Sequence, residues 1–201
     1  MRVAMARMLA SGSMPTPPNL RVVDQPLPYV DRLGERSLAD IELVVIHCTE
    51  LPDLATAREY GERVRYDSGT GNSGHYYIDR DGTVLRYVPE ERIAHHVRGQ
   101  NPRSLGIELV NTGRYPHWLD SRHQAMDEAY TDAQVESLVA LLQDLAARLP
   151  TLRHIAGHED LDRERVPASD DPAVLVHRKL DPGPRFPWER VLAQVPLQRL
   201  L

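Results

Sequence analysis

The pattern of hydrophobic and polar positions predicts several short strands and one long helix. Ile41–Ile46 is β-branched and almost continuously apolar, which is typical of a strand buried on both faces. Thr131–Leu149 has a helical period, and Thr131 and Gln134 form the capping-box pattern at its start. The apolar positions of this helix fall on one face: Val135, Leu138, Leu142, Leu145 and Leu149. Both segments therefore belong to a core.

A β-hairpin is predicted in the middle of the chain. Tyr76–Arg80 and Thr83–Val88 are strand-like and are separated by Asp81 and Gly82, a pair that favours a type I′ turn. Leu105–Val110 is a further short apolar strand, and it carries one acid, Glu108.

Shorter elements complete the expected domain. Leu54–Arg65 has helical character, Arg153–Ala156 is a late strand, and Pro187 opens a short helix that runs to Leu192. The polar, glycine-rich segment Asp67–Gly74 is expected to form the rim of a cleft. Because helices and strands are mixed rather than strictly alternating, we predict a mixed α/β (α+β) fold with a central mixed β-sheet flanked by helices.

The domain organisation follows from the proline pattern. Pro15, Pro17 and Pro18 indicate an extended or disordered lead-in over residues 1–25. No internal repeat or low-complexity block divides the remainder. We therefore expect one domain over residues 26–201.

Composition excludes several classes of protein. The chain has 24 Lys and Arg against 29 Asp and Glu, a net charge of −5, and lacks the basic balance of a nucleic-acid binder. No run approaches the ~18 apolar residues of a membrane span. A single cysteine, Cys48, excludes an intrachain disulfide and a four-cysteine zinc site. Nine histidines instead point to a histidine and carboxylate metal site.

The first residues lack the uninterrupted apolar stretch of a secretory signal, because Arg7 breaks it. We therefore expect a cytoplasmic protein. If the true start lies upstream and encodes a leader, the alternative is a periplasmic one.

A catalytic zinc ion takes three protein ligands and leaves one position for water. His47 ends the buried strand, His158 follows the late strand, and Asp181 lies in a proline-rich turn. Spacing alone does not select this trio, because nine histidines offer many others. Taken singly, His47 would be a core histidine, and Glu108 and Lys179 would be surface charges.

Six segments occur in the order seen in zinc N-acetylmuramoyl-L-alanine amidases. They are Val45–Thr49, Ser73–Gly82, Ser104–Leu109, Tyr130–Gln134, Ala156–Leu161 and Arg178–Trp188. The chain resembles the AmpD-type branch of this family over about Ile41 to Leu192, and the branch is related to amidase-type phage lysozymes and peptidoglycan recognition proteins. An ordered set of motifs is far more specific than any one of them.

The resemblance implies a mixed α/β fold and a zinc ion held by His47, His158 and Asp181. It also implies that Glu108 transfers protons and that Lys179 stabilises an oxyanion. Cys48 lies beside His47, but adjacent strand residues point to opposite faces, so we interpret it as a buried apolar residue.

The resemblance also implies residues that contact substrate. His75 and His96 match positions in the substrate cleft of the family, and His95 stands where many relatives have Trp. We further predict that Asn111 binds substrate through the carboxylates of the stem peptide. Two polar insertions, Asp162–His177 and Gly113–Ala129, depart from the family pattern and are expected to shape the cleft.

The function implied is hydrolysis of the amide between the lactyl group of N-acetylmuramic acid and L-alanine, in the recycling of anhydro-muropeptides. Peptidoglycan fragments are then the partners, and a monomer is expected. The alternatives are a periplasmic or lytic amidase that acts on intact peptidoglycan, and a non-catalytic muropeptide-binding module.

Overall fold

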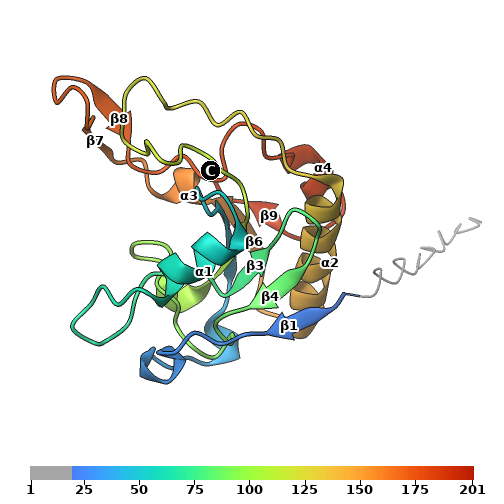
Figure 1. The fold of residues 1–201 in the computed structure, drawn as a ribbon. Coiled ribbons are helices and arrows are strands. Elements are labelled where there is room, and N and C mark those ends of the chain that lie inside the picture. Colours follow the sequence, from blue (N-terminus) through green and yellow to red (C-terminus); the bar gives the residue numbers. More distant parts are fainter. Residues whose placement is uncertain (1–19) are drawn as a thin grey trace, which may run out of the picture.

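The computed structural model describes residues 20–201, and its centre is a seven-stranded sheet with the order β1-β4-β3-β5-β2-β6-β9 (Figure 1). The strands are β1 (Val22–Asp24), β2 (Leu43–Cys48), β3 (Tyr76–Ile78), β4 (Val84–Arg86), β5 (Ser104–Leu109), β6 (His154–Gly157) and β9 (Gln198–Arg199). Only β3 and β4 pair antiparallel, and every other pair of neighbours is parallel. The predicted mixed sheet is confirmed.

The predicted N-terminal lead-in needs correction at its end. Residues 1–19 lie outside the described part of the chain. Val22–Asp24, which the prediction placed in the lead-in, instead forms β1 and pairs in parallel with Val84–Arg86 of β4. The sheet therefore begins before residue 25. Strand β1 pairs with the edge of β4 that would otherwise be free.

The helices lie on both faces of the sheet. They are α1 (Leu54–Glu62), α2 (Asp132–Arg148), α3 (His158–Leu161) and α4 (Trp188–Leu192), with three short 3-10 turns at Val30–Arg32, Leu38–Asp40 and Asn101–Arg103. The predicted long helix is confirmed as α2, and the Thr131 hydroxyl accepts from the Gln134 backbone N–H as the capping box requires.

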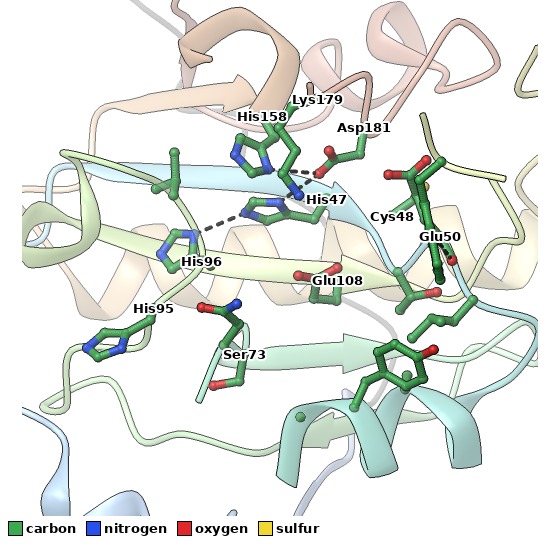
Figure 2. Close-up of a pocket in the computed structure, with 18 of the residues that line it drawn as sticks. His47, Cys48, Glu50, Ser73, His95, His96, Glu108, His158, Lys179 and Asp181 are labelled. Carbon is green, nitrogen blue, oxygen red and sulfur yellow. Dashed lines mark hydrogen bonds and ion pairs between the residues drawn. The ribbon is translucent and has the colours of Figure 1, made fainter. Parts of the chain in front are cut away.

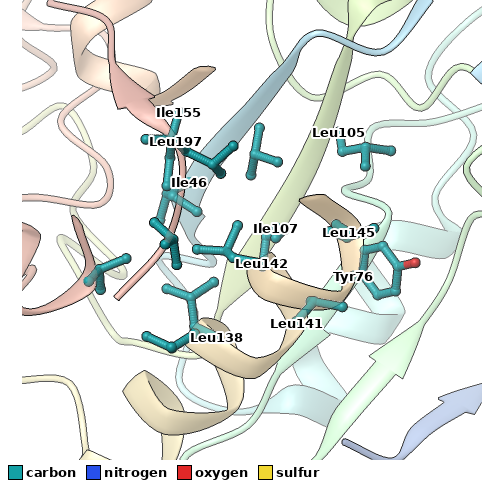
Figure 3. Packing of buried hydrophobic residues seen from close by; sticks show 14 of the residues in the cluster. Ile46, Tyr76, Leu105, Ile107, Leu138, Leu141, Leu142, Leu145, Ile155 and Leu197 are labelled. Atoms are coloured by element: carbon teal, nitrogen blue, oxygen red, sulfur yellow. The ribbon is translucent and has the colours of Figure 1, made fainter. Parts of the chain in front are cut away.

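The main core lies between α2 and one face of the sheet (Figure 3). The leucines of α2 pack there on residues of five strands, β2 to β6. The buried set includes Ile46, Tyr76, Leu105, Ile107, Leu138, Leu141, Leu142, Leu145 and Ile155. A second cluster on the opposite face joins Ala57 of α1 to Tyr77 and Leu85.

Strand alternation places the polar side chains on the face away from α2. Val44 and Ile46 of β2 belong to the core under α2, whereas Leu43 and Val45 belong to a cluster on the other face. By the same alternation, His47 lies on the face of Leu43 and Val45. In the register of the sheet, Glu108 of β5 lies beside His47 and also beside Tyr77 of β3.

The β3-β4 hairpin is confirmed, but the predicted type I′ turn is wrong. That turn needs a positive φ at both Asp81 and Gly82. Gly82 has φ 86°, but in residues 20–201 the only non-glycine residue with positive φ is Glu50. The Gly82 N–H donates to the Asp79 carbonyl and the Asp79 N–H to the Thr83 carbonyl, so the loop has three residues and ends on a left-handed glycine.

The insertion over 162–177 forms a second, two-stranded sheet. Its strands are β7 (Arg165–Pro167) and β8 (Leu175–His177), paired antiparallel. The sequence predicted only a polar stretch there, since each strand is three residues long and β7 ends on a proline. In the described part of the chain, no helix has the length and apolar character needed to cross a bilayer.

Candidate metal and catalytic site

Three predicted ligands meet at the carboxyl ends of neighbouring parallel strands. His47 is the fifth residue of β2, and His158 follows Gly157, the last residue of β6. Gly157 pairs in register with Ile46, so the two histidines arrive side by side. Strand β2 lies between β5 and β6, and the crevice at such a reversal of strand order is where α/β sheets bind ligands.

Asp181 completes the cluster from the turn after β8. One of its oxygens, Oδ2, lies 2.8 Å from His47 Nδ1 and 3.1 Å from His158 Nδ1. The turn is attached to α3 because the Glu159 N–H donates to the Asp181 carbonyl. It also approaches β6 closely, since a Cβ on Gly157 would lie 2.9 Å from Pro182 Cδ.

The cluster fits a metal ion. All three residues are at most 3% exposed, and one ligand atom from each lies within 4.8 Å of the others. Within residues 20–201, His158 Nε2 and Asp181 Oδ1 are buried without a hydrogen-bond partner, which is costly unless another group binds them. Two imidazoles and a carboxylate are a donor set that suits zinc.

The electrostatics of the cluster favour its metal-binding protonation states. Burial lowers the pKa of His47 to about 4, so its imidazole is neutral at ordinary pH, as a ligand must be. Burial alone would raise the pKa of Asp181, but His158 and His47 hold it well below its usual value. The Asp181 carboxylate therefore faces the neutral ring of His47.

Glu108 and Lys179 lie at the same cavity as the cluster (Figure 2). Burial, and then the charge of Asp181, raises the pKa of Glu108 well above its usual value. The approach of Gly74 confines this side chain, because a Cβ there would lie 2.8 Å from Glu108 Cγ. A carboxyl group with a raised pKa beside a metal-binding cluster is typical of an acid and base in catalysis.

The cavity has a volume of about 760 Å³. The glycine-rich loop contributes Asn72 and Ser73, which confirms its prediction as a rim. The insertion over 113–129 contributes Arg114, Trp118 and Leu119, so it forms a wall as expected. From the insertion over 162–177, no residue is among the described lining residues.

His96 lines the cavity and also contacts the cluster. Its Nδ1 lies 3.0 Å from His47 Nε2, and its Nε2 lies 3.2 Å from the Ser104 hydroxyl. Burial lowers the pKa of His96 well below its usual value, so this ring is neutral. His95 also lines the cavity, with its ring edge-on to Tyr66 at 5.0 Å between centroids.

His75, which the sequence predicts to contact substrate, is buried outside the cavity lining. His75 is 0% exposed and does not line the cavity. The Gly106 N–H donates to its Nδ1, and the Arg36 guanidinium lies 2.7 Å from its Nε2. Burial, and then the charge of Arg36, lowers the pKa of His75 to about 3. The ring is a neutral structural group beneath the site.

Asn111, which the sequence predicts to bind substrate, is also buried away from the cavity. The residue is 2% exposed and lies outside the cavity lining. The side-chain N–H donates to the Glu128 carbonyl, and its oxygen accepts from the Gly113 N–H. Asn111 therefore closes the base of the 113–129 loop.

A buried ion pair at the cavity wall was not predicted from the sequence. The Arg114 guanidinium donates from Nε to Glu50 Oε1 at 2.6 Å and from Nη2 to Oε2 at 2.8 Å. The two residues are 64 positions apart and belong to no motif, so only the fold reveals the contact. A glutamate two residues past the strand that carries His47 was the one available signal.

Comparison with known proteins identifies relatives across most of the chain. The family described as N-acetylmuramoyl-L-alanine amidase matches residues 37–184. The 1,6-anhydro-N-acetylmuramyl-L-alanine amidase AmpD of Enterobacter cloacae is 37% identical over 127 residues, 59% of this chain and 54% of AmpD. The N-acetylmuramoyl-L-alanine amidase AmiD of Escherichia coli is 34% identical over 178 residues, 81% of this chain and 56% of AmiD. The match thus spans about half the length of these curated relatives.

Solved structures share the fold. The N-acetylmuramoyl-L-alanine amidase LysC of Clostridium intestinale superposes with a TM-score of 0.63 at 22% identity, covering 89% of this chain and 99% of LysC. An AmpD structure gives 0.62 at 24% identity, covering 92% and 99%. The fold class predicted from the sequence is confirmed by these structures and by the sheet itself.

Proposed function

The chain belongs to the N-acetylmuramoyl-L-alanine amidase family, and from this we propose that it hydrolyses the amide between the lactyl group of N-acetylmuramic acid and L-alanine. The observation that carries the proposal is the convergence, on one cavity, of the buried donor set with Glu108 and Lys179. Such a set supplies each function that hydrolysis of an unactivated amide needs: an electrophile, a base and an anion-stabilising charge.

We propose zinc as the metal, held by His47, His158 and Asp181. The two buried atoms without partners, His158 Nε2 and Asp181 Oδ1, support an ion there. When bound, zinc supplies a Lewis acid that polarises the scissile carbonyl and makes water more acidic.

The chain itself supplies the proton transfer and the charge. Glu108 takes a proton from the attacking water and returns it to the amine of L-alanine as that group leaves. A raised pKa suits this exchange, because the carboxyl must both accept and release the proton. Lys179 places a positive charge near the carbonyl oxygen, where negative charge develops.

We propose soluble anhydro-muropeptides as the substrate, with a monomer acting in the cytoplasm. The name of the AmpD relative, a 1,6-anhydro-N-acetylmuramyl-L-alanine amidase, supports this choice. A fold relative, AmiD, has been solved in complex with the substrate anhydro-N-acetylmuramic acid-L-Ala-D-gamma-Glu-L-Lys. His96 is the residue of the predicted substrate set that reaches the cavity and so keeps that role in the proposal.

A second candidate function is an amidase that acts on intact peptidoglycan. It is favoured by a relative named as an endolysin, from Klebsiella phage KP32, which is 29% identical over 96 residues. A non-catalytic muropeptide-binding module is disfavoured, because all three metal donors are present together with Glu108 and Lys179.

The test is a product assay with two substrates. Purified protein is incubated with anhydro-muramyl tripeptide or with intact peptidoglycan sacculi, each with and without a chelator. We expect release of the L-alanine-headed peptide from the soluble fragment, loss of activity with the chelator and recovery when zinc is restored. Equal or faster release from sacculi would favour the second candidate. Absence of release from either substrate by zinc-loaded protein would refute the amidase proposal.

A further inference from the structure

The ion pair between Arg114 and Glu50 is the most deeply buried pair of opposite formal charges outside the metal cluster in residues 20–201. The side chain of Arg114 is 1% exposed and that of Glu50 is 8% exposed. Burying two charges is costly unless their geometry and additional hydrogen bonds compensate. Here the guanidinium engages both carboxylate oxygens, and the Arg114 backbone N–H lies 3.2 Å from Oε1 as a third donor.

Arg114 joins this carboxylate to the segment that carries two site residues. Its Nη1 donates to the His177 carbonyl at 2.9 Å, and its Nη2 donates to the Arg178 carbonyl at 3.4 Å. Lys179 is the next residue, and Asp181 follows two positions later. Glu50 lies three positions after His47, at the end of β2. One guanidinium therefore connects the strand of His47 to the turn of Asp181.

The local backbone is built around this contact. Glu50 adopts φ 49°, the strained left-handed region for a residue with a side chain. Gly113 has φ 52°, and a Cβ there would lie 2.7 Å from Glu50 Cγ. The Trp118 indole N–H donates to the Glu50 carbonyl at 3.1 Å. Several constraints thus place Glu50 where Arg114 can reach it.

We propose that Arg114 is a positioning residue that fixes the Lys179–Asp181 segment against the end of β2 and so sets the geometry of the metal donors. A lysine cannot replace it, because only the planar guanidinium donates to two carboxylate oxygens and two carbonyls at once. Neighbours that orient metal ligands typically change metal affinity or activity by about 10- to 100-fold when replaced.

The same loop offers a matched control. Arg80 pairs with both oxygens of Glu128, at 2.7 and 3.1 Å, and Glu128 accepts from the Thr112 N–H at the other end of the 113–129 insertion. This pair has similar geometry and supports the same loop, but Arg80 does not line the cavity and does not bond to residues 177–181. Arg80→Lys thus weakens the support of the same loop but leaves the contacts of Arg114 with residues 177 and 178 in place.

The first readout needs no substrate. Zinc affinity of the full chain is measured by competition with a chromophoric chelator, at a temperature where circular dichroism shows each variant to be folded. We expect Arg114→Lys to weaken zinc binding by about 10- to 100-fold and Arg80→Lys to stay within about twofold of the unsubstituted chain. Unchanged zinc affinity in folded Arg114→Lys would overturn the proposal, as would an equal loss in Arg80→Lys.

Glu50→Gln provides a second variant in case Arg114→Lys does not fold. It keeps one oxygen acceptor for Arg114, removes the charge and replaces the second acceptor with an NH2 donor. A weakening of zinc binding in the same direction is expected, and unchanged affinity in a folded Glu50→Gln protein would contradict the proposal.

The second readout separates kcat from KM, and it alone rests on the proposed amidase function. Because Lys179 acts on charge that develops during the reaction, Arg114→Lys should lower kcat by about tenfold or more with little change in KM. If the unsubstituted chain does not hydrolyse muropeptides, the proposed function fails while the zinc measurement still decides the role of Arg114. An unchanged kcat in an active, folded Arg114→Lys protein would count against it.

Discussion

The two oxygens of Asp181 distinguish the candidate metal centre from an ordinary buried ion pair. One oxygen contacts both histidines, whereas the other is buried without a partner in the described part of the chain. A carboxylate used only to pair with histidine would have both oxygens bound. The unpartnered oxygen is therefore the atom that most directly indicates a metal ligand.

Asp181→Ala should abolish tight zinc binding, because it removes one of three donors and leaves two imidazoles. Metal content after dialysis, measured by elemental mass spectrometry, checks this. Asp144→Ala, on the exposed side of α2, is the control and should retain about one zinc per chain. A tight zinc ion in Asp181→Ala would mean that the third ligand is another residue.

Glu108→Ala should leave zinc content unchanged and lower turnover by about 10²- to 10⁴-fold, the range for loss of a general base. Its carboxyl is not among the donor atoms that cluster, so the metal should stay. Steady-state kinetics together with metal analysis of the same sample provide the test. Near-normal turnover would remove Glu108 from the mechanism.

At the scale of elements, α2 stabilises the sheet from the face opposite the site. Leu142 is 0% exposed and packs in the cluster between α2 and the strands. Leu142→Ala should therefore lower the free energy of unfolding by about 2–5 kcal/mol, through lost burial and a residual cavity. Zinc affinity should stay unchanged, because the site lies on the other face.

Urea unfolding measures this cost, with Glu136→Ala on the exposed side of the same helix as the control. That control should stay within about 0.5 kcal/mol of the unsubstituted chain. A loss below about 1 kcal/mol in Leu142→Ala would show that the cluster collapses around the missing side chain.

Gly106 shows how strand β5 makes room for the site. A Cβ at Gly106 would lie 2.6 Å from the His96 ring, which in turn contacts His47. Gly106→Ala should displace His96 and destabilise the fold by about 1–3 kcal/mol, the usual cost of overpacking. Gly34→Ala, where the nearest atom would be 3.4 Å away, is the matched control.

Thermal unfolding and the histidine resonances in NMR spectra of both glycine variants test this expectation. We expect the His96 and His47 signals to shift in Gly106→Ala alone. Unchanged stability together with unchanged histidine signals would contradict it, because the added methyl group would then fit without displacing the His96 ring.

For the whole molecule, local patterns predicted the elements and the resemblance predicted the ligands. The apolar runs predicted β2, β5 and α2, because the hydrophobic period of a strand or a helix depends only on residues close together in the sequence. The predicted turn type was wrong, because a tertiary contact acts on this turn. Helix α2 approaches Gly82 closely, and a Cβ there would lie 2.8 Å from Ser137 Oγ.

Burial and pairing at long range were beyond sequence reasoning. His75 and His96 look alike in a motif, yet only His96 reaches the cavity, since Arg36 and Gly106 enclose the other ring. Arg114 and Glu50 meet only because the 113–129 insertion folds back over the end of β2. Such contacts follow from the packing of the whole domain.

The central claim is that this centre cleaves the amide between the lactyl group and L-alanine. The most direct test is hydrolysis of anhydro-muramyl tripeptide in heavy-oxygen water, with mass spectrometry of both products. We expect one heavy oxygen in the lactyl carboxylate of the sugar product, none in the peptide, and no products from Asp181→Ala. Heavy oxygen in the peptide, cleavage at another bond, or unchanged turnover by Asp181→Ala would contradict it.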